Sequence, residues 1–214
     1  MNLVLHNLLF LLEGAYWTLL IAVSSMVAGF FVGLAAVLAR LRGPAWLIAL
    51  ERFYVSAIRG TPVLVQIFIV YYGLPDVGIT FKPLTAAILS LSINIGAYLS
   101  ETFRAAILSV PKGQMEAALS LEMSPAQALR RIIFPQAARV AIPPVGNTFI
   151  GMLKETSLVS VITVTELLRS AQLLVAQYYL VMPFYFAIAV MYWLMSTGLS
   201  SVLNAVERRL SAAY

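Results

Sequence analysis

The chain contains no cysteine and only one histidine, His6. Without cysteine there can be no disulfide, no thiolate metal site and no thiol nucleophile. A single histidine excludes a histidine-rich metal centre and argues against catalysis built on histidine. We therefore expect no metal ion, no cofactor and no catalytic residue in this chain.

Charged residues are also scarce, at 11% of the 214 residues, whereas a soluble domain carries about 25%. Hydrophobic residues make up 61% of the chain, and the mean hydropathy is +0.91. A soluble fold of this composition would expose apolar helix faces that it could not cover. The composition therefore predicts an all-α integral membrane protein, with the lipid bilayer as its solvent.

Long apolar runs divide the chain into five predicted transmembrane helices within one domain, residues 1–214. The spans cover about residues 10–39, 53–74, 83–108, 136–161 and 180–204. The second is the weakest by hydropathy, because it contains Arg59, Gly60 and Pro62. Segment 162–179 is more polar, and we expect an amphipathic helix outside the membrane or a hairpin within the protein. The N-terminus lacks the basic start of a cleaved signal peptide, so the first run is expected to remain as a membrane helix.

The basic residues predict an orientation. Eleven of the 14 Lys and Arg residues fall on one side of the predicted membrane, in two loops and the C-terminal tail. Because cytoplasmic loops carry an excess of Lys and Arg, that side is expected to be the cytoplasm. The N-terminus is then outside and the C-terminus inside. The net charge of +5 comes from this bias and does not indicate nucleic-acid binding.

Small residues recur every four positions in the first span, at Ser25, Gly29 and Gly33. Such a row lets another helix approach closely. We favour packing within the chain over contact with a second copy.

Two prolines, Pro143 and Pro144, lie in the fourth predicted span. They remove two backbone donors, so a bend or a break is predicted there. Breaks of this kind often mark a substrate path in transporters, but a kink without a ligand is an equal alternative.

A polar segment, about residues 109–135, separates the third and fourth spans. Pro111 suits the start of a helix, and good helix formers follow it. A short helix is therefore predicted from Lys112 to about Met123.

A second helix is predicted directly after the first. Ser124 and Gln127 have the spacing of a capping box, and the helix is expected to run until Pro135 interrupts it. A short helix held between two spans would act as a lever if a partner pushed it. A solvated loop without a partner is the alternative.

The same segment carries a motif with a family resemblance. Glu116-Ala117-Ala118, with Ile132 and Pro135 at the expected spacing, resembles the EAA loop of bacterial ABC importer membrane subunits. Roughly residues 10–210 resemble the polar amino acid branch of that family, most closely its cystine-, glutamine-, histidine- and arginine-type permeases. The matching motifs are Arg59-Gly60-Thr61-Pro62 with Gln66, Ala97-Tyr98 with Glu101 and Arg104, Lys112-Gly113-Gln114, Pro135-Gln136-Ala137 with Arg139, Pro143-Pro144 with Asn147, and Lys154-Glu155-Thr156-Ser157-Leu158.

The loop departs from the family pattern at two positions. Glu122 stands where the pattern usually has glycine, and Phe134 where it has leucine. Glycine would permit a left-handed turn that glutamate resists, so we expect the turn to be displaced to Ser124.

The resemblance implies a type I ABC importer fold in the bacterial cytoplasmic (inner) membrane, with a cytoplasmic coupling helix. That helix would dock onto a dimer of ATP-binding subunits. The other implied partners are a periplasmic or surface amino-acid-binding protein and a second copy of the chain or a paralogous permease. The chain has no G-x-x-x-x-G-K-[ST] sequence, so it is not itself the enzyme that hydrolyses ATP. The predicted coupling residues are Lys112, Gly113, Glu116, Ala117, Ala118, Ser120, Glu122 and Met123.

Ionisable residues within the spans are candidates for contact with an amino acid substrate. The guanidinium of Arg104 would bind the carboxylate, and Glu155 would bind the ammonium group. Glu101 and Arg104 are three residues apart and could instead pair with each other, while Lys154 and Glu155 could serve gating or subunit packing. The remaining candidates for substrate contact are Glu101, Asn94, Tyr98, Thr156 and Ser157.

Two other functions are compatible with the residues. One is a secondary transporter driven by an ion gradient, although five spans show no inverted repeat and the polar segment would be unexplained. The other is a membrane scaffold or channel without substrate coupling. The interpretation that we favour is the permease subunit of an ATP-driven importer of polar amino acids.

Overall fold

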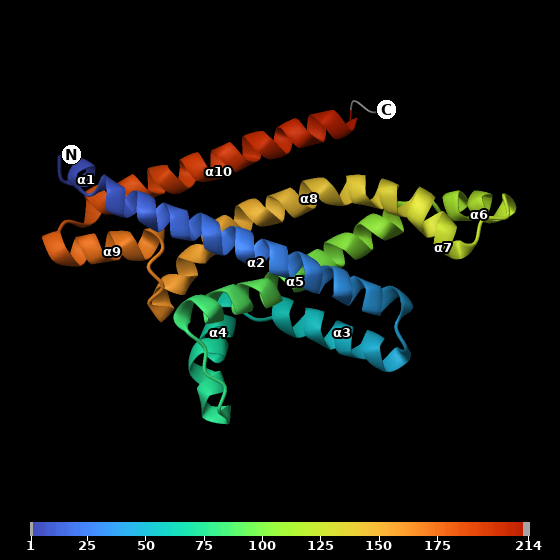
Figure 1. Ribbon diagram of the computed structural model, residues 1–214, viewed down its shortest axis with the longest axis horizontal. Coiled ribbons are helices and arrows are strands. Elements are labelled where there is room, and N and C mark those ends of the chain that lie inside the picture. Colours follow the sequence, from blue (N-terminus) through green and yellow to red (C-terminus); the bar gives the residue numbers. More distant parts are fainter. Residues whose placement is uncertain (1, 212–214) are drawn as a thin grey trace.

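A computed structural model describes residues 2–211, and every regular element within them is helical (Figure 1). The predicted all-α fold is therefore confirmed over these residues. The α-helices are α1 (Asn2–His6), α2 (Leu8–Arg42), α3 (Ala45–Arg59), α4 (Val63–Phe68), α5 (Pro83–Ser109), α6 (Lys112–Ser120), α7 (Pro125–Ala128), α8 (Phe134–Glu155), α9 (Leu167–Tyr178) and α10 (Val181–Ser211). Short π-helical segments adjoin them at η1 (Ile69–Gly73) and η3 (Leu129–Ile133), and short 3-10 helices at η2 (Leu74–Val77) and η4 (Thr156–Ile162).

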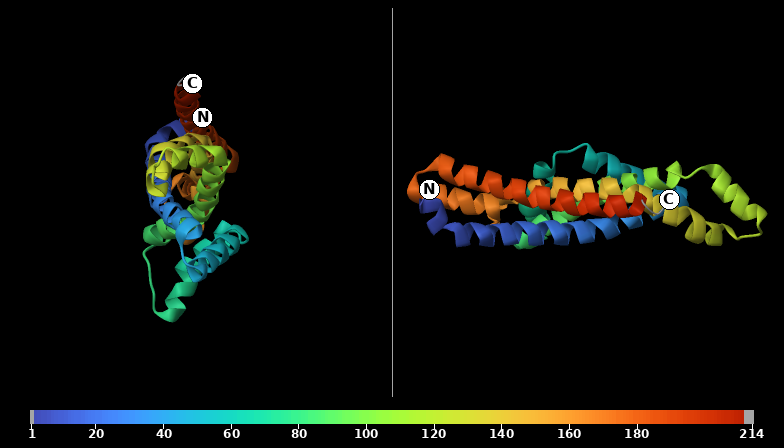
Figure 2. Two further views of the ribbon diagram at one scale, coloured as in Figure 1. Left: turned by 90° about the vertical axis from the view of Figure 1, so that its right-hand side faces the viewer. Right: turned by 90° about the horizontal axis from the view of Figure 1, so that it is seen from above.

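The long helices lie along one direction and form an elongated bundle (Figure 2). Three of them, α2, α5 and the apolar part of α10, are long and apolar enough to cross a membrane. Two bent pairs, α3 with Val63–Val77 and Pro125–Ile162 with α9, would raise the number of spans to five. The described helices therefore support between three and five spans.

The second predicted span, 53–74, is not one straight helix. α3 ends at Arg59, and the chain turns by 107° into Val63–Val77. The ring of Pro62 disfavours helical backbone at Thr61, so the helix ends before it.

Gln66 braces this turn. Its side-chain Nε2 donates hydrogen bonds to the carbonyl oxygens of Ile58 (2.7 Å), in the last turn of α3, and of Thr61 (3.0 Å), in the turn that follows. Its Oε1 accepts a hydrogen bond from Nδ2 of Asn94 in α5, at 3.0 Å. The turn is thus fixed to α5 through buried polar groups that satisfy one another.

The fourth predicted span, 136–161, corresponds to α8 followed by η4. Pro143 and Pro144 lie inside α8, where a bend or a break was predicted, and the helix curves without breaking (Figure 1). Pro135 does not interrupt the chain, because the wide π-helical turn η3 precedes it and leads directly into α8. A bend of 48° lies between η4 and α9.

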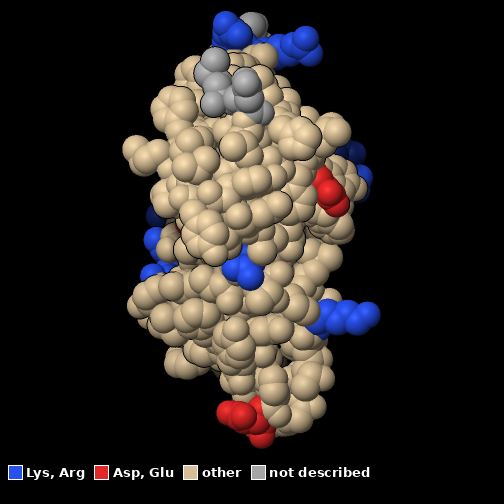
Figure 3. Space-filling model, turned by 90° about the vertical axis from the view of Figure 1, so that its left-hand side faces the viewer, with Lys and Arg blue, Asp and Glu red and all other residues tan. Residues whose placement is uncertain are grey.

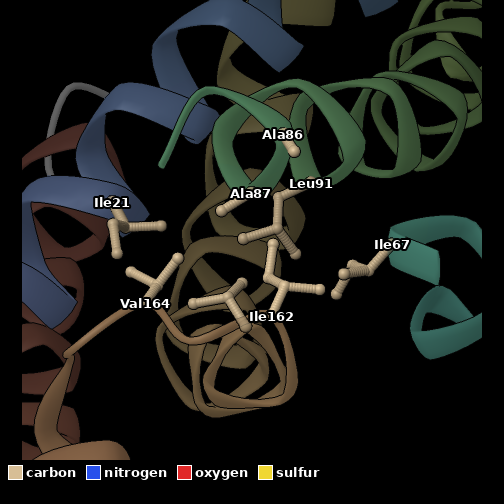
Figure 4. Close-up of a cluster of buried hydrophobic side chains, with 8 residues drawn as sticks. Ile21, Ile67, Ala86, Ala87, Leu91, Ile162 and Val164 are labelled. Atoms are coloured by element: carbon tan, nitrogen blue, oxygen red, sulfur yellow. The ribbon is translucent and has the colours of Figure 1, made fainter. Parts of the chain in front are cut away.

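One hydrophobic cluster joins four elements at the middle of the bundle (Figure 4). Ile21 of α2, Ile67 of α4, Leu91 of α5 and Ile162 of η4 are at most 1% exposed. Their side chains point toward one another, so this cluster fixes α4 and η4 against the two long helices.

α2 and α5 approach each other closely along the row of small residues. A β-carbon at Gly29 would overlap Cγ2 of Ile95, and one at Gly33 would lie 2.9 Å from the carbonyl oxygen of Gly96. Packing within the chain, the favoured interpretation of this row, is therefore what the structure shows.

Segment 162–179 contains α9, which packs against α2 and α10. Leu167, Ala171 and Leu174 of this helix are buried in one cluster with Leu11 and Phe184. The structure therefore shows a single helix here and not the hairpin, and the predicted place of that helix outside the membrane stays a prediction.

Candidate functional site

α6 and α7 form a hairpin at one end of the bundle, beyond the ends of the long helices (Figures 1 and 2). α5 leads into this hairpin, and η3 with α8 leads away from it. Met115 of α6 packs on a cluster that contains Ala106 of α5, Ile133 of η3 and Ala137 of α8. A displacement of α6 would therefore act directly on two long helices.

The predicted first helix begins at Lys112, as expected, but ends at Ser120 rather than near Met123. The predicted capping box is confirmed. The backbone N–H of Gln127 donates to Oγ of Ser124 (3.3 Å), and the backbone N–H of Ser124 donates to Oε1 of Gln127 (2.9 Å).

The predicted coupling residues differ in exposure. Ala118 is fully buried, so it lies on the inner side of the hairpin, where its small side chain permits close packing. Its carbonyl oxygen accepts the backbone N–H of Met123 at 3.2 Å, and Met123 is half-buried. The exposed members of the set are Lys112, Gly113, Glu116, Ala117, Ser120 and Glu122.

The turn between α6 and α7 is at Glu122, where φ is +60°. Ser124 has extended backbone, with φ −65° and ψ 152°. The expected displacement of the turn to Ser124 is therefore wrong. An N-cap residue needs extended backbone, so Ser124 cannot both cap α7 and make a left-handed turn. Glu122 takes the left-handed conformation at a cost of about 1 kcal/mol.

Two exposed leucines at the same hairpin were not predicted as functional. Leu121 is 76% exposed and Leu119 is 45% exposed. Their sequence signal is that they are apolar residues within an otherwise polar segment. Exposed apolar side chains beside charged ones are typical of protein–protein contact surfaces.

The predicted substrate residues Glu101 and Arg104 pair with each other on α5. Nη2 and Nε of Arg104 donate to Oε2 of Glu101 at 2.7 and 3.0 Å. The structure thus shows the alternative interpretation for this pair. Oε1 of Glu101 takes part in neither of these hydrogen bonds.

Three other predicted substrate residues form hydrogen bonds to protein groups. Asn94 is buried and donates to Gln66. The hydroxyl groups of Thr156 and Ser157 donate to carbonyl oxygens of the preceding turn, Leu153 and Lys154, at 2.7 Å each.

Arg104 and Glu155 lie at different levels of the bundle. Ile95 and Leu99 of α5 share one core cluster with Met152 of α8. α5 and α8 run in opposite directions, so Arg104 and Glu155 lie on opposite sides of this cluster, about 8 to 12 residues at 1.5 Å each, or about 12–18 Å, apart along the bundle. Within one chain, Glu155 therefore does not lie beside Arg104.

A hollow of about 530 Å³ lies between the end of α3, the second half of α5 and α8. Tyr98 and Glu101 line it, and so does Arg59, which was not predicted as a substrate residue. The guanidinium carbon of Arg59 lies 5.3 Å from the ring centre of Tyr98. The other lining residues are Thr102, Ala105, Ala106, Ser109, Val140 and Pro144.

Two buried carboxylates outside the predicted site hold helices together. Glu51 of α3 accepts hydrogen bonds from Arg40 (2.8 Å) and Ser100 (3.0 Å). Glu166 caps α9 and accepts the hydroxyl of Tyr192 in α10 at 2.8 Å. Both connect helices that are distant in sequence, which explains why sequence patterns gave no signal for them.

Charge is distributed unevenly between the two ends. The end opposite α6 is mostly uncharged on its surface (Figure 3). The other end carries Arg40 and Arg42 at the last turn of α2, Lys112 at the start of α6, and exposed Arg130 and Arg131 in η3.

Comparison with known proteins gives this arrangement a family. Residues 25–212 match the family model of the binding-protein-dependent transport system inner membrane component. The chain is 44% identical over 201 residues to the L-cystine transport system permease protein TcyB of Bacillus subtilis (strain 168), covering 92% of this chain and 85% of the relative. It is 40% identical over 205 residues to the glutamine transport system permease protein GlnP of Escherichia coli (strain K12), covering 94% and 92%.

Solved structures agree with these relatives. A crystal structure of an amino acid ABC transporter with histidines matches at a TM-score of 0.92 and 36% identity, over 96% of both chains. The MetNI methionine ABC transporter in inward-facing conformations shares the fold, with a TM-score of 0.78 and 19% identity over 95% of this chain and 97% of that one. The chain thus belongs to the binding-protein-dependent inner membrane components of bacterial ABC transporters, as a multi-span permease of the polar amino acid type, and is the membrane subunit of an amino acid importer rather than its ATPase.

Proposed function

We propose that this permease supplies half of a translocation path for polar amino acids and is driven through α6 by a dimer of ATP-binding subunits. The position of α6 is the observation that supports this most directly. The helix lies beyond the other helices at one end of the bundle (Figure 2), and Lys112, Glu116 and Ala117 are exposed on it. Its inner side rests on α5, η3 and α8 through Met115, so a push on α6 tilts the long helices.

The end that carries α6 would face the cytoplasm, with the N-terminus outside and the C-terminus inside. The basic residues at that end support this orientation, because Lys and Arg are enriched in cytoplasmic loops. The mostly uncharged opposite end would then meet the binding protein (Figure 3).

A second copy of this chain, or a paralogous permease, would complete the path, since a single bundle forms only half of it. A periplasmic or surface binding protein would deliver the amino acid. Two relatives are named for L-cystine and for glutamine, which supports polar amino acids as the substrate class.

The hollow between α3, α5 and α8 is proposed as part of the path. Tyr98 and Glu101, both predicted as substrate residues, line it. Four other predicted substrate residues would stabilise the helices around the path, because their side chains bond to protein groups: Arg104, Asn94, Thr156 and Ser157. Glu155 is exposed at the far end of α8 and would contact substrate elsewhere on the path.

Co-purification with the ATP-binding subunits tests the role of α6. Leu121→Glu places a charge on the most exposed apolar residue of the hairpin and should reduce recovery of the ATPase about tenfold or more, because a charge is costly to bury at an interface. Gln177→Glu, an exposed position in α9 at the other end of the bundle, is the matched control and should leave recovery unchanged. Equal recovery with both variants would contradict docking at α6.

A further inference from the structure

Arg59 is the positively charged side chain that lines the hollow between α3, α5 and α8. It is exposed and forms no ion pair within residues 3–209. By contrast, Arg40 and Arg104 are paired with Glu51 and Glu101. The guanidinium of Arg59 can therefore accept an anionic partner without breaking an existing pair.

The fold holds Arg59 in place. Arg59 is the last residue of α3, where the chain turns by 107°, and Gln66 bonds to the carbonyl oxygens on both sides of it, those of Ile58 and Thr61. The face of Tyr98 contacts the guanidinium, in a geometry that stabilises a cation. Arg59 is thus positioned by its braced backbone and by the ring of Tyr98. Its guanidinium forms no salt bridge with an acidic side chain among residues 3–209.

Glu101 offers the opposite charge in the same hollow. Both hydrogen bonds from Arg104 go to Oε2, and Oε1 accepts no hydrogen bond from a described residue. Tyr98, whose ring lies beside the Arg59 guanidinium, is three residues before Glu101 on α5, so the two side chains lie on neighbouring positions of one helix face and line the same hollow as Arg59. One guanidinium and one carboxylate oxygen therefore face a shared space.

We infer that Arg59 and Glu101 recognise the zwitterionic backbone of the amino acid: Arg59 binds the carboxylate, and Oε1 of Glu101 binds the ammonium group. In an α-amino acid these two groups are attached to one carbon, so they need partners in one place. The hollow of about 530 Å³ lies in the size range of small-molecule sites and can hold an amino acid. The site would recognise the carboxylate and ammonium groups that all α-amino acids share. Other groups would determine the selectivity for the substrate side chain.

This inference rests on the proposed function and changes its residue assignment. Arg104 becomes a positioning residue that orients Glu101, instead of the ligand of the carboxylate. Charged substrate groups need such partners, because unpaired charges are costly within a membrane path.

Direct binding to the permease–ATPase complex in lipid nanodiscs, without binding protein, tests the inference. The probes are L-cystine, L-glutamine and L-histidine, each compared by calorimetry with its decarboxylated amine: cystamine, 4-aminobutanamide and histamine. The wild type should bind at least one amino acid more tightly than its amine. Arg59→Gln should weaken the binding of that amino acid about tenfold or more and abolish the preference, since a hydrogen bond to a charged group is lost.

The matched control is Arg52→Gln, an exposed arginine on the same helix that does not line the hollow, and it should bind like the wild type. Arg104→Gln should keep the preference for the amino acid, because Arg59 is unchanged. Glu101→Gln should weaken the amino acid and its amine alike, because both carry the ammonium group.

Two results would overturn the inference. One is an Arg59→Gln variant that retains the preference, and the other is a wild type that prefers none of the three amino acids to its amine. Either result leaves ATPase co-purification through α6 untouched, so failure of this site and failure of the proposed function are distinguishable.

Discussion

Gly33 in α2 gives the sharpest test of the packing between α2 and α5. A β-carbon there would lie 2.8 Å from Cβ of Leu99, 2.9 Å from the carbonyl oxygen of Gly96 and 3.1 Å from the amide nitrogen of Ser100. Two of these atoms are backbone, so the helices must separate, because no side chain can rotate to relieve the overlap. Overpacking of this kind should lower the free energy of unfolding of Gly33→Ala by about 1–3 kcal/mol.

Gly151→Ala is the matched control, because no atom lies within 4 Å of a β-carbon built at Gly151. Both substitutions replace a helical glycine and gain about 1 kcal/mol of helix propensity. The difference between the two variants therefore isolates the steric cost. Unfolding with sodium dodecyl sulfate in mixed micelles, followed by circular dichroism, should give a lower midpoint for Gly33→Ala than for Gly151→Ala. Equal midpoints would refute close packing of the two helices.

Gly29 adds a rescue experiment within the same contact. Its β-carbon would overlap a side-chain atom, Cγ2 of Ile95, which Ile95→Ala removes. The combined variant Gly29→Ala/Ile95→Ala should therefore lose less stability than the sum of its single substitutions. Additive losses would mean that the two residues do not touch.

Three further substitutions have expected effects on stability. Glu122→Gly should stabilise the α6–α7 hairpin by about 1 kcal/mol, because glycine adopts positive φ without strain, and slower proteolysis of the hairpin would show it. Gln66→Leu should destabilise the protein by about 1–3 kcal/mol in the same micelle assay, since carbonyl oxygens lose their donor; no change would mean that the turn needs no brace. Glu166→Leu should cost at least about 2 kcal/mol, whereas Glu166→Gln, which keeps an acceptor, should cost less; equal losses would contradict the hydrogen-bonding role.

Features that depend on neighbouring residues were predictable from the sequence. The long apolar runs gave α2 and α5 nearly to their ends, and Ser124 with Gln127 gave the capping box, because these signals act within a few residues. The spacing of Gly29 and Gly33 gave the contact face of α2 for the same reason.

Features that depend on distant residues were not predictable. The sharp turn after α3 is braced by Gln66 and Asn94, which are 28 residues apart in the chain. Pro135 was expected to interrupt the helix that begins at Pro125, but the π-helical turn η3 carries the chain directly into α8. Local preference therefore failed where contacts between helices decide the backbone.

In the candidate site too, features that depend on neighbouring residues were predictable and features that depend on distant residues were not. The exposed coupling residues followed from the polar segment, but the burial of Ala118 depends on how α6 packs. Arg59 was known only as part of a sequence motif, and its place beside Tyr98 and Glu101 follows from the turn after α3. Family membership also decides against the secondary transporter and the scaffold.

The orientation of α6 is the central claim, and one labelling measurement tests it most directly. The chain has no cysteine, so Glu116→Cys introduces the only thiol in this subunit. A membrane-impermeant maleimide should modify it in inside-out vesicles but not in intact spheroplasts, and bound ATP-binding subunits should protect it. Modification in intact spheroplasts, or labelling that the ATPase does not reduce, would contradict a cytoplasmic coupling helix.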